Sequence, residues 1–213
     1  AEAAVVAGCL EAGANGPSFW PWMQSGPNAH LARLVNSFHV YDNLNRVMQA
    51  GELLRADIGC MGHGYGGDVG RTLPVSGRFS DDQAFLHDHL VGAYRAGIDV
   101  MRPGVPVLAV GEAATAYLER VRDTAGTDRE RELLDAMIEG VVWHVHSIGI
   151  ESAEAVDDVF ADGTVIDFEP MFSHGEDAWY LEDMILVTEA GAEILTAGLP
   201  TTAAEIEAAM AGR

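Results

Sequence analysis

The chain has 213 residues, of which 48% are hydrophobic, and this length and composition suit one domain with a substantial buried core. Its 33 acidic residues outnumber its 12 basic residues, which are all Arg, and the formal net charge is −21. Such a negative surface repels nucleic acid and anionic membranes, so neither is an expected partner. The acidity is equally typical of a solubilising or halophile-type surface and does not by itself indicate a site.

The two cysteines, Cys9 and Cys60, are too few for a disulfide framework or a thiolate zinc site. We therefore expect them to be reduced and the protein to be cytoplasmic. No apolar run approaches the ~20 residues of a membrane span, and the first residues lack a basic n-region. Because the chain begins at Ala1 in helix-like sequence, we expect residues 1–213 to form one domain from which an N-terminal domain or targeting segment is missing.

The first third of the chain is predicted to contain a helix, a loop and two strands. Residues 1–12 read as a helix that Gly13 closes, and residues 15–28 are rich in Gly, Pro and Asn, which is typical of a loop. Residues 53–59 and 68–75 have strand composition and are separated by a glycine-rich turn.

The remaining elements alternate long helices with a block of strands. Ser80 with Gln83, and Thr202 with Glu205, form capping boxes that each predict the start of a helix. Further helices are expected near residues 107–122 and 128–139, and strands over residues 141–150, 164–168 and 179–188. No strand–helix–strand alternation is visible, so the sequence predicts an α+β fold with a mainly antiparallel sheet.

Four carboxylates lie in strand-like runs whose neighbours are apolar. They are Asp57 in LLRADIG, Asp68 in YGGDVGRT, Glu169 in VIDFEP and Glu182 in WYLEDMILV. A buried carboxylate is costly without a partner, and metal ions are one class of partner. Any one of them alone is also explained by a solvated strand face, because antiparallel sheets often have one wet side.

Taken together and in this order, the strings DIGCMGHGYGGDVGRTLPVSGRFS, VHSIGIE, VIDFEP and LEDMILVTEAGAEILT resemble the catalytic domain of the pita-bread (M24) metallopeptidases. This family includes Xaa-Pro aminopeptidase, prolidase and methionine aminopeptidase. The likeness is strongest to the Xaa-Pro aminopeptidase branch, in GYGGDVGRTLPVSGRFSDDQ and in the later RPG. The resemblance implies a curved antiparallel sheet covered by helices, and a homodimer.

The resemblance also implies two divalent metal ions. By position, Asp57 chelates one ion, Asp68 and Glu182 bridge both, His146 binds the other, and Glu169 ligates that ion and serves as general base. Two like charges about 4 Å apart repel by about 4 kcal/mol at an effective dielectric of 20, so four clustered carboxylates need cations. The oxygen-rich set suits Mn, Fe, Co or Zn, with Mn the expected metal.

The positions that would handle a peptide depart from the family pattern. Arg33 and Ala153 stand where members carry His, and Tyr180 stands where Xaa-Pro-cleaving members carry Arg two residues before the last Glu. Losing one donor to a developing oxyanion typically costs about 10²–10³ in rate. We therefore expect a hydrolase of altered specificity that is a poor general peptidase.

Several other side chains could take part. His30 and His63 are candidate catalytic residues that could replace the missing imidazoles, while Arg33, Tyr180 and His144 are candidate substrate-binding residues. His144 alternates with His146 in a strand and therefore faces the same side, where it contacts substrate or supports a ligand. His87 and His89, on a helix, are expected to be solvated.

The first hypothesis is thus a dinuclear-metal hydrolase that cleaves a C–N bond of a small peptide or small molecule. Two alternatives remain open: a non-peptidase metal-dependent enzyme such as a lyase, and a catalytically weak binding module on the same fold. Retention of all five ligand positions counts against the binding module, and the altered accessory positions count against an ordinary peptidase.

Overall fold

The computed structural model describes residues 1–30 and 46–212, so Arg33 lies outside the described residues. The elements, in chain order, are α1 (Glu2–Glu11), β1 (Gly16–Pro17), β2 (Trp22–Ser25), the short 3-10 helix η1 (Gly26–Asn28), β3 (Leu53–Ile58), β4 (Cys60–Met61), β5 (Val69–Pro74), α3 (Asp81–Ile98), α4 (Leu108–Thr124), α5 (Asp128–Gly140), β6 (Val142–Ser147), β7 (Val165–His174), β8 (Asp177–Tyr180), β9 (Asp183–Thr188), β10 (Gly191–Ile194) and α6 (Ala203–Ala211).

Local sequence signals set the helix starts. Both predicted capping boxes are confirmed: the Ser80 side chain accepts a hydrogen bond from the backbone N–H of Gln83, and Thr202 accepts one from Glu205. A third box, which opens α5 at Thr127, was not predicted. The helix ends lie within a few residues of the expected ones, as is usual where the last turn frays.

The strands pair antiparallel throughout the described residues, which confirms the predicted α+β class. One sheet has the order β2-β3-β5, and another has the order β10-β9-β7-β6 with β8 also paired to β7. The predicted strand 179–188 is interrupted between β8 and β9. At this break Glu182 exchanges backbone hydrogen bonds with Gly70 of β5, which joins the two sheets.

Strand β7 runs well beyond its predicted end at Phe168. Its first half, up to Phe168, pairs with β9, and its second half, from Met171, pairs with β8. Pro170 lies between the two halves, where the partner on this edge changes. Because proline lacks a backbone N–H, it is tolerated at such a change of partner, although in sequence it resembles a strand end.

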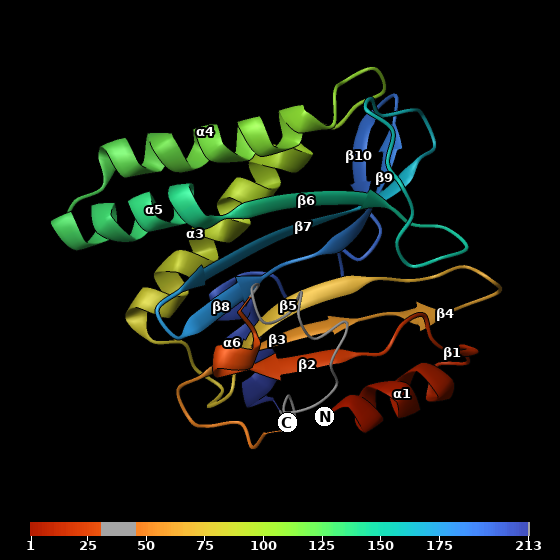
Figure 1. Ribbon diagram of the computed structural model, residues 1–213, viewed down its shortest axis with the longest axis horizontal. Coiled ribbons are helices and arrows are strands. Elements are labelled where there is room, and N and C mark those ends of the chain that lie inside the picture. The colour runs from red at the N-terminus through yellow and green to blue at the C-terminus, as the bar shows by residue number, and fades with distance from the viewer. Residues whose placement is uncertain (31–45, 213) are drawn as a thin grey trace.

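Helices α3, α4 and α5 lie together along one side of β6 and β7 (Figure 1). Successive side chains of β7 point to opposite faces of the sheet, so one face of the strand packs against the helices and the other faces away from them. Ile166 and Phe168 belong to the core beneath the helices, where the Phe168 ring stacks on Tyr94 of α3. Asp167 and Glu169 alternate with them and therefore face away from the helices, toward β3 and β5.

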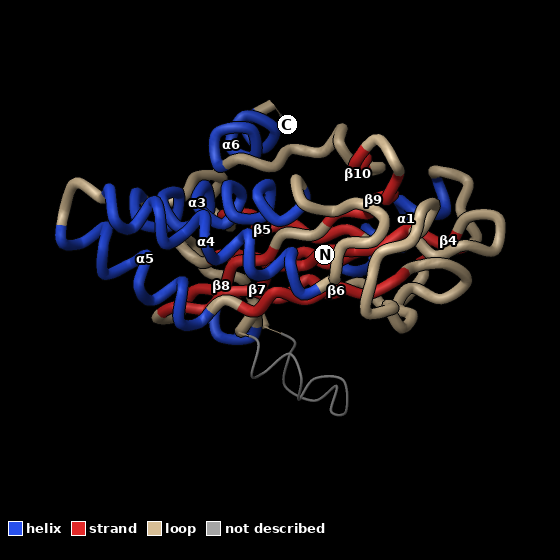
Figure 2. The backbone as a smooth tube through the Cα atoms, turned by 90° about the horizontal axis from the view of Figure 1, so that it is seen from above, coloured by secondary structure: helices blue, strands red, loops and turns tan. Residues whose placement is uncertain are grey.

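The last helix, α6, lies on the flank of the domain next to α3 (Figure 2). The Ala203 backbone N–H donates to the Asp88 carboxylate of α3 at 2.9 Å. His87 is fully buried here: its ring stacks on Phe79, and its Nε2 lies 2.8 Å from the Thr201 carbonyl oxygen. The expectation that His87 is solvated is therefore wrong, because α6 covers a helix face that the local sequence leaves open.

A disulfide joins Cys9 of α1 to Cys60 of β4. The expectation of two reduced cysteines is therefore wrong in this structure. The cause is tertiary: α1 packs beside the small β1–β4 sheet and brings together residues separated by 51 positions. Disulfides persist mainly in oxidising compartments, so the cysteines no longer support a cytoplasmic location.

Candidate metal centre

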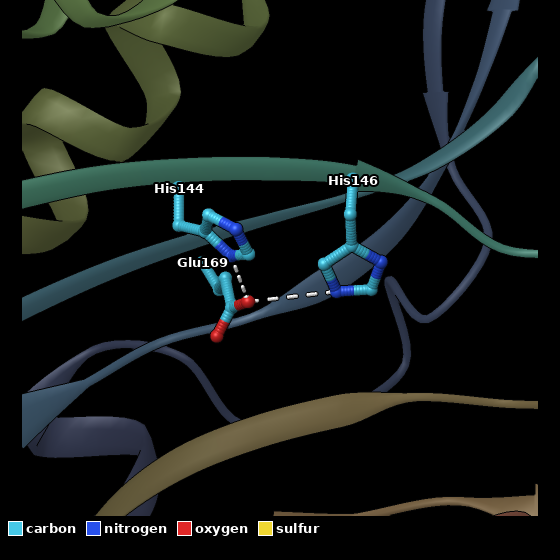
Figure 3. A group of neighbouring side chains, drawn as sticks. All are labelled: His144, His146 and Glu169. Carbon is cyan, nitrogen blue, oxygen red and sulfur yellow. Dashed lines mark hydrogen bonds and ion pairs between the residues drawn. The ribbon is translucent and has the colours of Figure 1, made fainter. Parts of the chain in front are cut away.

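Two histidines and a glutamate face one another across β6 and β7. Register places His144 opposite Glu169, and His146 opposite Asp167, and directly opposed residues of an antiparallel pair share a face. The His144 Nδ1 contacts Glu169 Oε1, and His146 Nε2 lies 3.5 Å from the same oxygen (Figure 3). These three side chains form a group whose ligand atoms lie within 4.8 Å of one another.

A second group shares His146 with the first. Its members are Asp68, His146 and Glu182, all buried, with ligand atoms again within 4.8 Å of one another. Asp68 directly precedes β5, and Glu182 lies at the junction of the two sheets beside Gly70. The loop before β5 and the break between β8 and β9 therefore converge on the histidine of β6.

Asp57 completes the set from β3. It is paired in register with Gly70, the residue that bonds to Glu182, so it lies at the same junction. Its Oδ2 accepts a hydrogen bond of 2.9 Å from Arg55 Nη2. The structure thus brings Asp57, Asp68, His146, Glu169 and Glu182 to one buried region between the sheets.

Several carboxylates of this region are buried close together, which perturbs their pKa values. Burial, with Glu182 nearby, raises the pKa of Asp57 to about 8, and burial with Glu182 and Asp57 raises the pKa of Asp68 to about 12. Burial would lower the pKa of His146, but contacts with Glu182 and the Ser147 carbonyl raise it to about 9. The shifts follow from burial and from the neighbouring negative charges.

Unpartnered oxygens of the described residues lie in the same region. Asp68 Oδ1 and both carboxylate oxygens of Asp167 are buried and lack a hydrogen-bond partner among the described residues. Burial, with Glu182 nearby, raises the pKa of Asp167 to about 9. Since buried polar atoms are normally satisfied, these oxygens fit divalent cations that would pair with them.

Asp167 was not predicted as a site residue. The signal was present, because it lies two positions before Glu169 in VIDFEP and therefore faces the same side of β7. Glu169 differs from its neighbours: burial would raise its pKa, but the contact with His144 lowers it. Glu169 is therefore the carboxylate of the group that most readily stays ionised.

Tyr180, a candidate substrate-binding residue, is buried, and its hydroxyl contacts two of the proposed metal ligands. Its hydroxyl lies 2.6 Å from Glu182 Oε2 and 3.0 Å from Glu169 Oε2. Arg55, which was not predicted, lies with its guanidinium carbon 3.8 Å from the centroid of the Tyr180 ring. A single Arg on a strand carries no motif, so only the fold reveals this neighbour.

The structure does not bring the remaining candidates to the ligand cluster. His30 lies beside Asp177, at the opposite end of β8 from Tyr180, with its Nε2 buried. His63 is exposed at the tip of the turn between β4 and β5, with a φ of 52°. Ala153 is also exposed, in the segment between β6 and β7.

The chain has relatives of one kind along nearly its whole length. A model of metallopeptidase family M24 matches residues 1–189. The mitochondrial intermediate cleaving peptidase 55 of Arabidopsis thaliana is 28% identical over 211 residues, covering 93% of this chain and 41% of that protein. The Xaa-Pro aminopeptidase 2 of Streptomyces coelicolor is 32% identical over 198 residues, covering 81% of this chain and 42% of that protein.

Solved structures agree on the fold. The Pseudomonas aeruginosa aminopeptidase PepP is similar with a TM-score of 0.76 and 27% identity, over 96% of this chain and 50% of that one. A variant Escherichia coli aminopeptidase P in complex with substrate has a TM-score of 0.80 at 24% identity, over 97% and 50%. The expected pita-bread fold is confirmed, and the chain spans about half the length of these relatives.

Proposed function

Because the chain belongs to metallopeptidase family M24, we propose that it is the catalytic part of a dinuclear-metal hydrolase of altered specificity. The reaction is attack by an activated water on a C–N bond of peptide type, in a small peptide or a small molecule. The observation that carries the proposal is the convergence of Asp57, Asp68, His146, Glu169 and Glu182 in one buried region with too little positive charge.

The residues present fit two cations. Divalent cations held there would neutralise the carboxylates, polarise the attacked carbonyl and make a water more acidic. By the family resemblance Asp68 and Glu182 are the proposed bridges, Asp57 would hold one ion and His146 the other; Asp68, His146 and Glu182 have ligand atoms within 4.8 Å of one another. Mn is the proposed metal because most donors are oxygens, with Fe, Co or Zn as alternatives.

Glu169 is the proposed general base. Its Oε1 contacts both histidines of β6, and its Oε2 contacts the Tyr180 hydroxyl. The lowered pKa means that its carboxylate is ionised near neutral pH and can accept a proton from the attacking water. The same group, once protonated, can return that proton to the leaving nitrogen.

The surroundings of the cluster support altered specificity. Ala153 offers no donor, and Tyr180 turns its hydroxyl toward ligand carboxylates rather than toward open space. A non-peptidase activity such as a lyase is the second candidate, because the carboxylate cluster is retained while the imidazole at position 153 is not. Substrate contact by His144 is compatible with its half-exposed side chain.

Two measurements test the proposal. Elemental analysis of the purified protein should give close to two divalent ions per chain. The full-length protein, reconstituted with metal, should hydrolyse Xaa-Pro di- and tripeptides slowly. Its Glu169→Gln variant should be slower still. A protein that binds no divalent metal under saturating Mn²⁺, Co²⁺ or Zn²⁺ contradicts the proposal.

Assembly and location are also matters of proposal. We propose a homodimer, as in the family resemblance, to be tested by light scattering, and a cytoplasmic location, to be tested by fractionation. None of the helices in the described part of the chain is long and apolar enough to cross a bilayer. The Cys9–Cys60 disulfide counts against this location, because disulfides persist mainly in oxidising compartments.

A further inference from the structure

Arg55 is a buried cation beside the proposed metal ligands. It lies on β3 with 3% of its surface exposed, and its guanidinium lies over the ring of Tyr180 and near that of Trp22. The distances from the guanidinium carbon to the two ring centroids are 5.7 Å and 3.8 Å. Burying a charge is costly unless the charge is paired, so the contacts of the Arg55 guanidinium indicate the role of this residue.

One contact is with a proposed ligand. Arg55 Nη2 donates to Asp57 Oδ2 at 2.9 Å, and both side chains are nearly inaccessible to solvent. In a β-strand, residues two apart share a face, so the guanidinium reaches the carboxylate along β3 itself. This contact restrains Oδ2 of Asp57 and leaves Oδ1 free of Arg55.

The stacked ring carries the connection to two more ligands. The Tyr180 hydroxyl lies within hydrogen-bond distance of both Glu182 and Glu169. It has one hydrogen and two acceptors, so it orders the pair of carboxylates relative to each other. The backbone of Tyr180 is itself fixed, since Thr72 Oγ1 bonds to both its N–H and its carbonyl oxygen.

Gly70 of β5 leaves the space that the Tyr180 ring occupies. A Cβ at Gly70 would lie 2.0 Å from Tyr180 Cε1, so any larger residue there would displace the ring. Gly70 is also the register partner of Asp57. A glycine at this position thus lets the Tyr180 ring lie over the junction of the sheets, against Arg55.

We infer that Arg55 and Tyr180 form a positioning pair for the metal centre, which we name the Arg55–Tyr180 stack, and that it holds Asp57, Glu169 and Glu182 in binding geometry. The inference rests on the proposed function. Xaa-Pro-cleaving members carry an Arg at the position of Tyr180 on β8. In this chain Arg55 on β3 supplies a positive charge beside Tyr180 instead. Tyr180 is then a positioning residue rather than a lost donor.

The test measures metal affinity rather than turnover. Metal-free protein is titrated calorimetrically with Mn²⁺, and in parallel with Zn²⁺, for wild type, Tyr180→Phe and Arg55→Leu. Tyr180→Phe keeps the ring and removes only the hydroxyl. Each variant should bind about 10–100-fold more weakly, the range typical of residues that orient metal ligands. The double variant should lose less than the product of the two losses, because both act through one stack.

A swap distinguishes positioning from general damage. The double variant Arg55→Leu, Tyr180→Arg places the guanidinium on β8 instead of β3. It should bind Mn²⁺ at least about 10-fold more tightly than Arg55→Leu alone, because about 10-fold is the smallest loss typical of a residue that orients a metal ligand. Arg129→Leu is the matched control: it removes an exposed Arg that pairs with Asp82 and Glu132 far from the site, and affinity should not change. Circular dichroism of each metal-free variant checks that the fold persists.

The outcomes separate the two proposals. Absence of Mn²⁺ and Zn²⁺ binding by the wild type overturns the proposed function, and the stack with it. Wild-type binding with unchanged affinity in Tyr180→Phe and Arg55→Leu overturns the stack alone. Should Arg55→Leu not fold, Tyr180→Phe decides, and unchanged affinity in that variant is sufficient to reject the inference.

Discussion

The buried ligand positions at the sheet junction contrast with two exposed segments of the chain. Asp57, Asp68, His146, Glu169 and Glu182 are all buried and lie on or beside strands whose register fixes them. His63 and Ala153 lie on exposed segments outside the named strands. Buried carboxylates need protons or cations for charge balance, whereas an exposed residue can change at little cost in stability. The contrast therefore teaches that metal binding and peptide handling can diverge separately.

The largest expected effect is in the buried region. Asp68→Ala or Glu182→Ala removes a proposed bridging ligand and should lower the metal content by more than one ion per chain. Hydrolysis should fall by about 10³-fold or more, since metal ions contribute several kcal/mol and about 4 kcal/mol corresponds to that factor. Elemental analysis and initial rates check this. Unchanged metal content in both variants would show that these residues are not bridges.

The exposed region should respond in the opposite direction. We expect wild-type turnover of Xaa-Pro peptides to lie below the ordinary range of about 1–10³ s⁻¹, and Ala153→His to raise it by about 10²-fold by restoring a donor. Ala155→His, at another exposed alanine of the same segment, is the control. Ordinary wild-type turnover that Ala153→His does not change would mean that the altered position is irrelevant to peptide cleavage.

Asp167 sharpens the boundary of the buried region. Asp167→Asn keeps the shape of a fully buried side chain but removes its charge. We expect Mn²⁺ affinity to fall about 10–100-fold, and the metal-free protein to become no less stable, because the carboxylate oxygens have no protein partner. Calorimetry and thermal melts measure both. Exposed Asp99→Asn is the control, and a large loss of metal-free stability would instead indicate a structural role.

The smallest expected effect is a pH dependence of the metal-free protein. Its carboxyl groups at Asp57 and Asp167 have pKa values raised to about 8 and about 9, mainly by burial. A group whose pKa is raised on folding contributes stability below its unfolded pKa, near 4, and loses it as pH rises through the folded pKa. His146, raised to about 9, changes in the same direction above its unfolded value.

We therefore expect the Tm of the metal-free protein to fall between about pH 4 and about pH 9, the span of these shifts. With saturating Mn²⁺ the dependence should flatten or reverse, because cations take the place of the bound protons. Thermal melts across this range with and without metal measure it. A metal-free Tm that rises with pH would show that charged groups of the protein itself, and not bound protons, compensate the buried carboxylates.

Short-range signals along the chain predict most of the secondary structure. The capping boxes at Ser80 and Thr202, and the strand-like runs around Asp57 and Glu169, depend on neighbours only a few residues away. Backbone propensity and capping act over this same distance, which is why these elements were predictable. The longer β7, which continues past Pro170, was not, because its second half exists only through pairing with β8.

Residue types at fixed spacing were enough to predict the family resemblance, the α+β class and the identity of the proposed ligands. Which side chains meet follows only from the tertiary structure. The pairing of Cys9 with Cys60, the burial of His87 by α6 and the stacking of Arg55 on Tyr180 each join residues far apart in the chain. Such contacts follow from strand register and helix packing, and no local pattern encodes them.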